Sequence, residues 1–220
     1  MHVNLLIVDD HMPIIEGYKS ILSFNKSGYI INTTAANCLE SAYKILTDPN
    51  RKTQFDAVLV DFTLPEYLEK GLKTGEDLIP VVRHYSPQSK VVMLTSHSET
   101  ILLYRILNES KPEGLLVKSD FTAEEFLVAF DILMSGENYY TSTVLRCKKE
   151  MVIGNKIFDH YNRQIIYLLS QGVKTKNIQE ELHLSKSAID KRKSMIKDLL
   201  GIDKGSDEDI LREARKQGLI

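Results

Sequence analysis

The chain has 220 residues, of which 43% are hydrophobic and 26% are charged, and its formal net charge is −2. This composition is that of an ordinary globular protein, and the length suits two small domains. No apolar run approaches the roughly 20 residues that a membrane-spanning helix needs, and the N-terminal residues lack the layout of a signal peptide. We therefore expect a cytoplasmic protein with no membrane partner.

The first part of the chain alternates short apolar runs with segments of helical periodicity. Runs of Val, Ile and Leu bounded by turn residues are typical of strands buried on both faces, and helices between them favour parallel pairing. This order predicts an α/β fold with a doubly wound, five-stranded parallel sheet. We expect strands near 3–8, 29–35, 55–60, 90–95 and 114–117, and helices near 13–24, 38–48, 75–85, 99–109 and 123–135.

Polar residues follow four of these strands at the point where each strand ends. They are Asp9 with Asp10, Asp61, Thr95 and Lys118. Ligands of an open parallel sheet bind outside the carboxyl ends of its strands, so these side chains are expected in one crevice. Any one carboxylate alone is better explained as an ordinary strand-end or helix-capping residue. Their joint placement on four strand ends favours a site.

This set of side chains suits phosphoryl chemistry. Carboxylates about 4 Å apart repel by about 4 kcal/mol per pair at an effective dielectric near 20, so a proton or a cation must relieve them. Oxygen ligands of this kind suit Mg²⁺, and a carboxylate beside it can attack phosphorus. The Lys118 ammonium and the Thr95 hydroxyl could each meet one oxygen of the transferring phosphoryl group.

The last part of the chain differs in charge and pattern. Residues 1–155 contain 15 Lys and Arg against 20 Asp and Glu, a balance of −5, whereas residues 156–220 contain 13 against 10, a balance of +3. Residues 137–155 break the periodicity and are expected to link two modules. Beyond them the pattern predicts a small all-α domain, with helices near 160–171 and 175–182, a third after Ser185, and a fourth near 207–217.

The third of these helices carries five basic residues, Lys186, Lys191, Arg192, Lys193 and Lys197. A helix pair joined by a tight turn, with a basic second helix, is typical of insertion into the DNA major groove. On charge alone, an ordinary helix with a solvated charged face explains this pattern better.

The strand-end residues together resemble the receiver domain of two-component response regulators, which is flavodoxin-like, over about the first 135 residues. The resemblance implies that phosphate arrives on Asp61 from a partner histidine kinase or a small phosphodonor. It also implies that Mg²⁺ is held by Asp10, Asp61 and the Thr63 carbonyl, with Asp9 acting through water. Thr95 is then the switch hydroxyl, and Lys118 the phosphate-binding ammonium.

Residues 156–220 resemble the four-helix helix-turn-helix domain of LuxR/NarL-type regulators. The resemblance rests on the order of helix, QG turn, helix, HLS, basic helix and LGI. It implies a receiver domain at 1–136, a linker at 137–155 and a DNA-binding domain at 156–220, and a homodimer in the active state. By position, the DNA contacts are Lys186, Ser187, Asp190, Lys191, Ser194 and Lys197.

Several residues depart from these family patterns. Asp190 stands where the family often has Lys, Gln179 where it has a small residue, and His183 where it has a turn glycine. Lys193 and Leu115 replace an aliphatic and an aromatic residue, respectively. The loop after Asp61 is about five residues longer than usual, and we interpret it as a mobile surface segment beside the crevice.

We therefore predict a phosphorylation-controlled DNA-binding transcription regulator that is not an enzyme. The alternative is a phosphorylation-independent dimerisation or interaction protein, whose weakened helix-turn-helix binds a protein partner. A phosphatase of the haloacid-dehalogenase kind ranks third, because its acidic motif lies on one strand end, whereas Asp61 lies far along the chain from Asp9 and Asp10.

Overall fold

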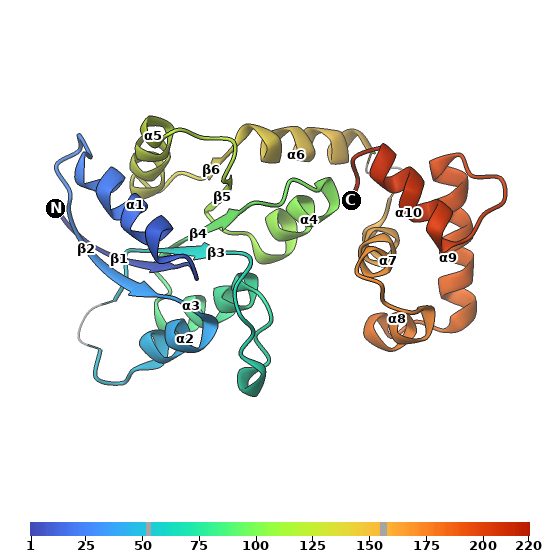
Figure 1. Cartoon of the computed structure of the whole chain (residues 1–220), viewed down its shortest axis with the longest axis horizontal. Helices are drawn as coiled ribbons and strands as arrows, with labels where there is room; N and C mark the ends of the chain where they lie inside the picture. The colour runs from blue at the N-terminus through green and yellow to red at the C-terminus, as the bar shows by residue number, and fades with distance from the viewer. Residues whose placement is uncertain (52–53, 155–157) are drawn as a thin grey trace. The chain divides into compact units, whose positions relative to one another are not determined.

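The computed structural model describes residues 1–51, 54–154 and 158–220 (Figure 1). Its contacts divide the chain into two compact units, one formed by Met1–Ser96 and Ile106–Val144, the other by His97–Arg105 and Leu145–Ile220. Within the described ranges, no helix has the length and apolar character needed to cross a membrane.

The first unit is built on one parallel sheet with the strand order β2-β1-β3-β4-β5-β6. Helices α1 and α5 lie on one face of this sheet, and α2 and α3 lie on the other (Figure 1), which confirms the doubly wound arrangement. The strands are β1 (His2–Val8), β2 (Ile30–Ala36), β3 (Ala57–Asp61), β4 (Lys90–Thr95), β5 (Gly114–Val117) and β6 (Tyr139–Tyr140), and the helices are α1 (Met12–Ser23), α2 (Leu39–Thr47), α3 (Leu78–Tyr85) and α5 (Ala123–Met134).

The central strands are buried on both faces, as their uninterrupted apolar runs indicate. Leu5 and Ile7 of β1 pack in the core with residues of α1 and α5. Leu6 and Val8 point to the opposite face because side chains alternate along a strand, and they are fully buried as well. Two helical layers therefore cover the sheet.

The sheet has six strands where five were expected, and the stretch expected to link the two modules contains regular structure. Tyr139 and Tyr140 form β6, which pairs with Gly114 and Leu115 of β5 and adds a sixth strand at the sheet edge. Residues Ser142–Gly154 form a helix, α6. A strand of two residues is too short to show a period of two in the sequence, and here the free edge of β5 induces it.

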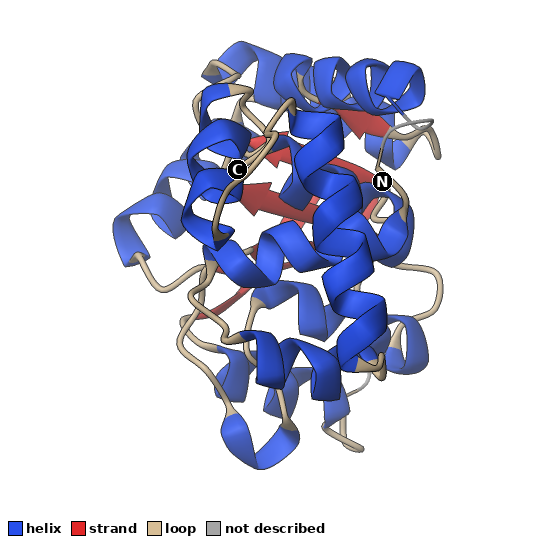
Figure 2. Cartoon of the chain, turned by 90° about the vertical axis from the view of Figure 1, so that its right-hand side faces the viewer, coloured by secondary structure: helices blue, strands red, loops and turns tan. Residues whose placement is uncertain are grey.

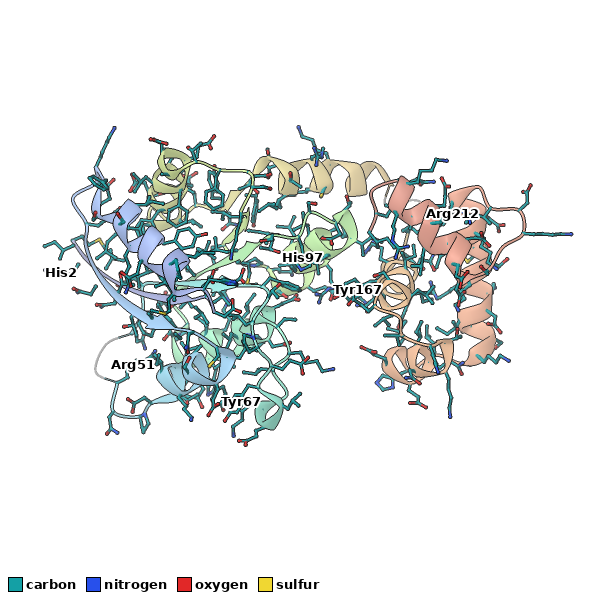
Figure 3. All side chains as sticks on the ribbon, in the orientation of Figure 1. His2, Arg51, Tyr67, His97, Tyr167 and Arg212 are labelled. Carbon is teal, nitrogen blue, oxygen red and sulfur yellow. The ribbon has the colours of Figure 1, made fainter. Side chains whose placement is uncertain are left out.

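The long loop after β3 has local structure of its own. It contains two short 3-10 helices, η1 (Leu68–Lys70) and η2 (Gly75–Asp77). Tyr67 and Leu72 form an antiparallel bridge, with backbone hydrogen bonds of 2.8 and 3.1 Å. The Tyr67 ring lies edge-on to Tyr43 of α2, with 6.0 Å between ring centroids, and is labelled in Figure 3. The loop is therefore a small hairpin anchored on α2.

The α-helix expected at 99–109 is shorter than predicted. Helix α4 covers Thr100–Arg105, and a π-helix, η3, continues over Ile106–Ser110. The next residue, Lys111, has φ 48°, and its amide donates to the Ile106 carbonyl at 3.1 Å. Because the residue before a proline disfavours the α conformation, Pro112 ends the helix here.

The C-terminal part of the chain forms four helices, which confirms the expected all-α pattern. They are α7 (His160–Ser170), α8 (Thr175–Leu182), α9 (Lys186–Leu200) and α10 (Asp207–Lys216). Figure 2 draws all helices of the chain in blue and its strands in red. The side chains of Asp159, Ser185 and Ser206 cap α7, α9 and α10, respectively. Residues buried among these helices include Ile165, Ile166, Leu169, Ile178, Ile189, Ile196, Ile210 and Ala214.

Two adjacent residues of α9, one buried and one exposed, allow a test of this core. Ile196 is 0% exposed, whereas Met195 is 43% exposed. We expect Ile196→Ala to lower the free energy of unfolding by about 2–5 kcal/mol, because it leaves a cavity. The matched control Met195→Ala should change it by less than about 0.5 kcal/mol. Urea denaturation followed by circular dichroism measures both, and equal effects would contradict this packing.

Candidate functional site

The strand register brings the predicted site residues to one edge of the sheet. Asp61 is the last residue of β3 and pairs with Leu94 of β4. Val8 pairs with Val60, so Asp9, the residue after Val8, lies level with Asp61. Thr95 ends β4, and its carbonyl accepts the Lys118 amide at 2.7 Å.

The Lys118 ammonium joins two of the carboxylates. Its Nζ lies 2.9 Å from Oδ2 of Asp9 and 2.9 Å from Oδ1 of Asp61. The Asp9 side chain is fully buried, and that of Asp61 is 8% exposed. The expected meeting of these three side chains is therefore confirmed, although Asp9 and Lys118 lie 109 residues apart in the chain.

Asp10 turns toward a residue that the sequence analysis missed. Its Oδ1 lies 2.7 Å from Nδ1 of His11, whose backbone amide donates to Oδ1 of Asp9 at 2.9 Å. The ligand atoms of Asp9, Asp10 and His11 lie within 4.8 Å of one another, whereas Asp61 is outside this group. Because His11 directly follows the acidic pair, its position in the sequence could have indicated that it lies beside these carboxylates.

The other predicted receiver residues occupy different environments. Thr95 is fully buried, and Thr63 is exposed two positions after Asp61. Leu115, which replaces the usual aromatic residue, is fully buried and pairs with Met93 and Tyr140 in neighbouring strands. The aromatic residue closest to this position in the sheet register thus comes from β6.

Burial controls the acidity of the site. It raises the pKa of the Asp61 carboxyl, although the hydrogen bond and charge of Lys118 oppose this effect. Partial burial by itself would lower the pKa of Lys118, but the hydrogen bonds to Asp9 and Asp61 outweigh it, and the pKa rises. Burial likewise raises the pKa of Tyr18 on α1 to about 12. Lys118 therefore remains a cation, and the Tyr18 phenol stays neutral at physiological pH.

Helix α9 presents the predicted DNA contacts on its surface. Lys186, Ser187, Asp190, Lys191 and Ser194 are exposed, and Lys197 is half-buried. Their spacing of three and four residues places Ser187, Asp190, Lys191 and Ser194 on a single face.

Two of the five basic residues of α9 form ion pairs with acidic residues elsewhere in the C-terminal helical region. Nη1 of Arg192 lies 2.6 Å from Oδ2 of Asp159, the N-cap residue of α7, and its guanidinium lies 4.7 Å from the centre of the Tyr161 ring. Nζ of Lys193 is bonded to Thr175 and Asp207, at 2.6 Å in each case. Lys193 can thus stand at a buried position because both partners satisfy its ammonium.

Comparisons with known proteins agree with this geometry. A family model described as the response regulator receiver domain matches residues 5–130. The chain is 23% identical to the transcriptional regulatory protein MctR of Rhizobium johnstonii, over 99% of this chain and 95% of that protein. It is also 23% identical to the oxygen regulatory protein NreC of Staphylococcus aureus, over 99% of each chain.

A solved structure has the same fold. It is RcsB from Salmonella enterica serovar Typhimurium, bound to a promoter in the presence of the phosphomimetic BeF3−. The TM-score is 0.63 and the identity 19%, over 96% of this chain and 97% of RcsB. The similarity covers the sheet and the C-terminal helices together.

The raised pKa of Asp61 predicts a gain in stability when its charge is removed. In the unfolded chain, Asp61 loses its proton near the ordinary value of 3.8, whereas the folded chain keeps it to higher pH. The folded chain therefore binds more protons in this window, and its stability falls as pH rises through it. We expect Asp61→Asn to raise the unfolding temperature at pH 7 in EDTA, and to do so less at pH 4.

Thermal unfolding at several pH values measures this effect. Lys118 keeps Asp9 as a partner in the variant, so no new unpaired charge is created. Glu66→Gln, which alters an exposed carboxyl of the same unit, is the matched control and should leave the midpoint unchanged. A less stable Asp61→Asn protein at pH 7 would contradict the assignment of burial as the dominant effect.

Proposed function

The chain belongs to the response regulator receiver domain family through residues 5–130, and on this basis we propose that it is a phosphorylation-controlled, DNA-binding transcription regulator of a two-component system. The observation that carries the proposal is the Lys118 ammonium, 2.9 Å from both Asp9 and Asp61 at the carboxyl edge of the sheet. A cationic donor in this position can stabilise the negative charge of a phosphoryl group that is transferred to the carboxylate.

In the proposed reaction, Asp61 is the nucleophile. One of its carboxylate oxygens forms a bond to phosphorus, while the bond from phosphorus to the histidine nitrogen of a kinase, or to the acetate oxygen of acetyl phosphate, breaks. The electron pair leaves with that nitrogen or oxygen. Lys118 and the hydroxyl of Thr95 then donate to the phosphoryl oxygens, and Asp61 reacts as the deprotonated carboxylate that Lys118 favours.

The donor atoms of the site suit Mg²⁺. Carboxylate oxygens of Asp9, Asp10 and Asp61 and the backbone carbonyl of Thr63 are all hard oxygen donors, the ligand type that this ion prefers. We propose that Asp10, Asp61 and the Thr63 carbonyl hold the ion, with Asp9 acting through water. When bound, Mg²⁺ supplies positive charge that offsets the developing negative charge of the phosphoryl oxygens.

We further propose a receiver domain at 1–136, a linker at 137–155 and a DNA-binding domain at 156–220. Phosphorylation would shift the receiver toward a conformation that favours a homodimer. Two α9 helices would then enter successive major grooves, about 34–36 Å apart. Lys186, Ser187, Asp190, Lys191, Ser194 and Lys197 are the proposed contacts, and the RcsB structure bound to a promoter supports DNA binding by a chain of this fold.

The second candidate is an interaction protein that acts without phosphorylation. It is favoured by the surface of α9, where Asp190 is exposed, while Arg192 and Lys193 are paired with Asp159 and Asp207, respectively. Only Lys186, Lys191 and Lys197 then remain for phosphate contacts among the basic residues of this helix. Salt-dependent DNA binding distinguishes the two candidates.

The phosphoacceptor role predicts a defined labelling pattern. With acetyl phosphate and Mg²⁺, the wild-type chain should shift in Phos-tag electrophoresis. The Asp61→Asn protein should not shift, because the nucleophilic oxygen is lost, and addition of EDTA should prevent the shift of the wild type. An unshifted wild-type chain would exclude Asp61 as phosphoacceptor for this donor.

The DNA-binding role predicts a steep salt dependence. Each Lys or Arg that neutralises a phosphate contributes about −0.9 to the slope of log K against log salt concentration. Fluorescence anisotropy with sheared double-stranded genomic DNA should therefore give a slope that becomes about one unit less negative in Lys191→Ala. Lys204→Ala, which alters an exposed loop lysine, should keep the wild-type slope. Salt-independent binding would instead support the interaction protein.

A further inference from the structure

The loop after β3 returns directly onto the backbone of Asp61. A Cβ atom placed on Gly75 would lie 1.9 Å from the Asp61 carbonyl oxygen and 2.7 Å from Cγ1 of Val60. The Gly75 amide also donates to the carbonyl of Phe62 at 2.9 Å. No side chain fits between these two segments, so the position of Gly75 and that of the Asp61 backbone determine each other.

A local turn places Gly75 in this position. The Thr74 side chain accepts from the backbone of Asp77, and the Asp77 carboxylate accepts the Thr74 amide at 2.9 Å, which forms a capping box around η2. The same carboxylate accepts the Lys73 amide at 2.8 Å. These bonds define the shape of the turn but do not attach it to the rest of the unit.

Besides the bond of Gly75 to Phe62, Glu76 attaches the turn to another segment, and its side chain is buried although it carries a carboxyl group. Glu76 is 8% exposed, and the Ser110 hydroxyl donates to its Oε1. Ser110 is the last residue of the π-helix η3 and precedes Lys111, whose φ is 48°. The bond thus joins two segments that lie 34 residues apart in the chain.

We propose that Glu76 is a positioning residue for phosphoryl transfer to Asp61, held in place by Ser110 and acting through Gly75. This inference rests on the proposed function. Removal of the Ser110 hydroxyl leaves a buried carboxyl with one donor fewer, which favours movement of η2 toward solvent. Because Gly75 packs against the Asp61 carbonyl, such a movement displaces the end of β3, and a displacement of about 1 Å can slow a reaction by about 100-fold.

The test uses the full-length chain, with acetyl phosphate as phosphodonor and Mg²⁺ at a saturating concentration. Ser110→Ala and Glu76→Ala should each lower the maximal rate of Asp61 labelling by about 3- to 30-fold, with the half-saturating acetyl phosphate concentration unchanged. The double variant should be no slower than the slower single variant, because both remove the same bond. Glu76→Gln should restore most of the rate, since its amide oxygen accepts the Ser110 hydroxyl.

The control is Glu40→Ala, which removes an exposed carboxylate of α2 that pairs with Lys44 at 2.6 Å and should keep the wild-type rate. Wild-type labelling by Ser110→Ala overturns the positioning role, as does a Glu76→Gln protein that is as slow as Glu76→Ala. Circular dichroism at the assay temperature must show folded variants, and a rate loss that only follows unfolding also overturns it. An unlabelled wild-type chain overturns the proposed function itself, so the two failures are distinguishable.

Discussion

The ion pairs of Lys118 with Asp9 and Asp61 are the interactions on which the site depends. Two carboxyl groups buried at neighbouring strand ends repel each other, and the protein interior screens that repulsion poorly. A single ammonium 2.9 Å from both offsets it. Burial nevertheless raises the pKa of Asp61. The site is thus built for chemistry at a cost in stability, as is common for functional residues.

The parallel sheet makes this arrangement possible. Parallel strands end at the same edge, so residues from distant parts of the chain can share one crevice. Burial of both faces also leaves that edge as the place where polar side chains can lie. The loop after β3 contributes to the same edge, because Gly75 packs against Asp61 and Glu76 attaches the loop to Ser110. The loop therefore packs against the end of the strand that carries Asp61.

Ion pairs within the C-terminal helices reduce the positive charge that α9 presents to solvent. From the sequence, α9 has five basic residues, but the partners of Arg192 and Lys193 lie on other helices. The ion pair of Lys193 with Asp207 joins α9 to α10, and the pair of Arg192 with Asp159 joins α9 to the start of α7. Charge counts along a helix therefore overestimate the charge that a nucleic acid can meet. Lys186, Lys191 and Lys197 remain, and the exposed Asp190 carries a negative charge. The surface of α9 is therefore less basic than its count of basic residues suggests.

The sequence by itself determined the fold class, the order of the first five strands with their helices, and the strand-end residues Asp9, Asp61, Thr95 and Lys118, because apolar periodicity and strand ends are local properties of the chain. Tertiary structure alone decided the sixth strand, since β6 forms only where the edge of β5 is available. It also decided the partners of Lys193 and the contact of Gly75 with Asp61, since these join segments whose proximity no local pattern encodes.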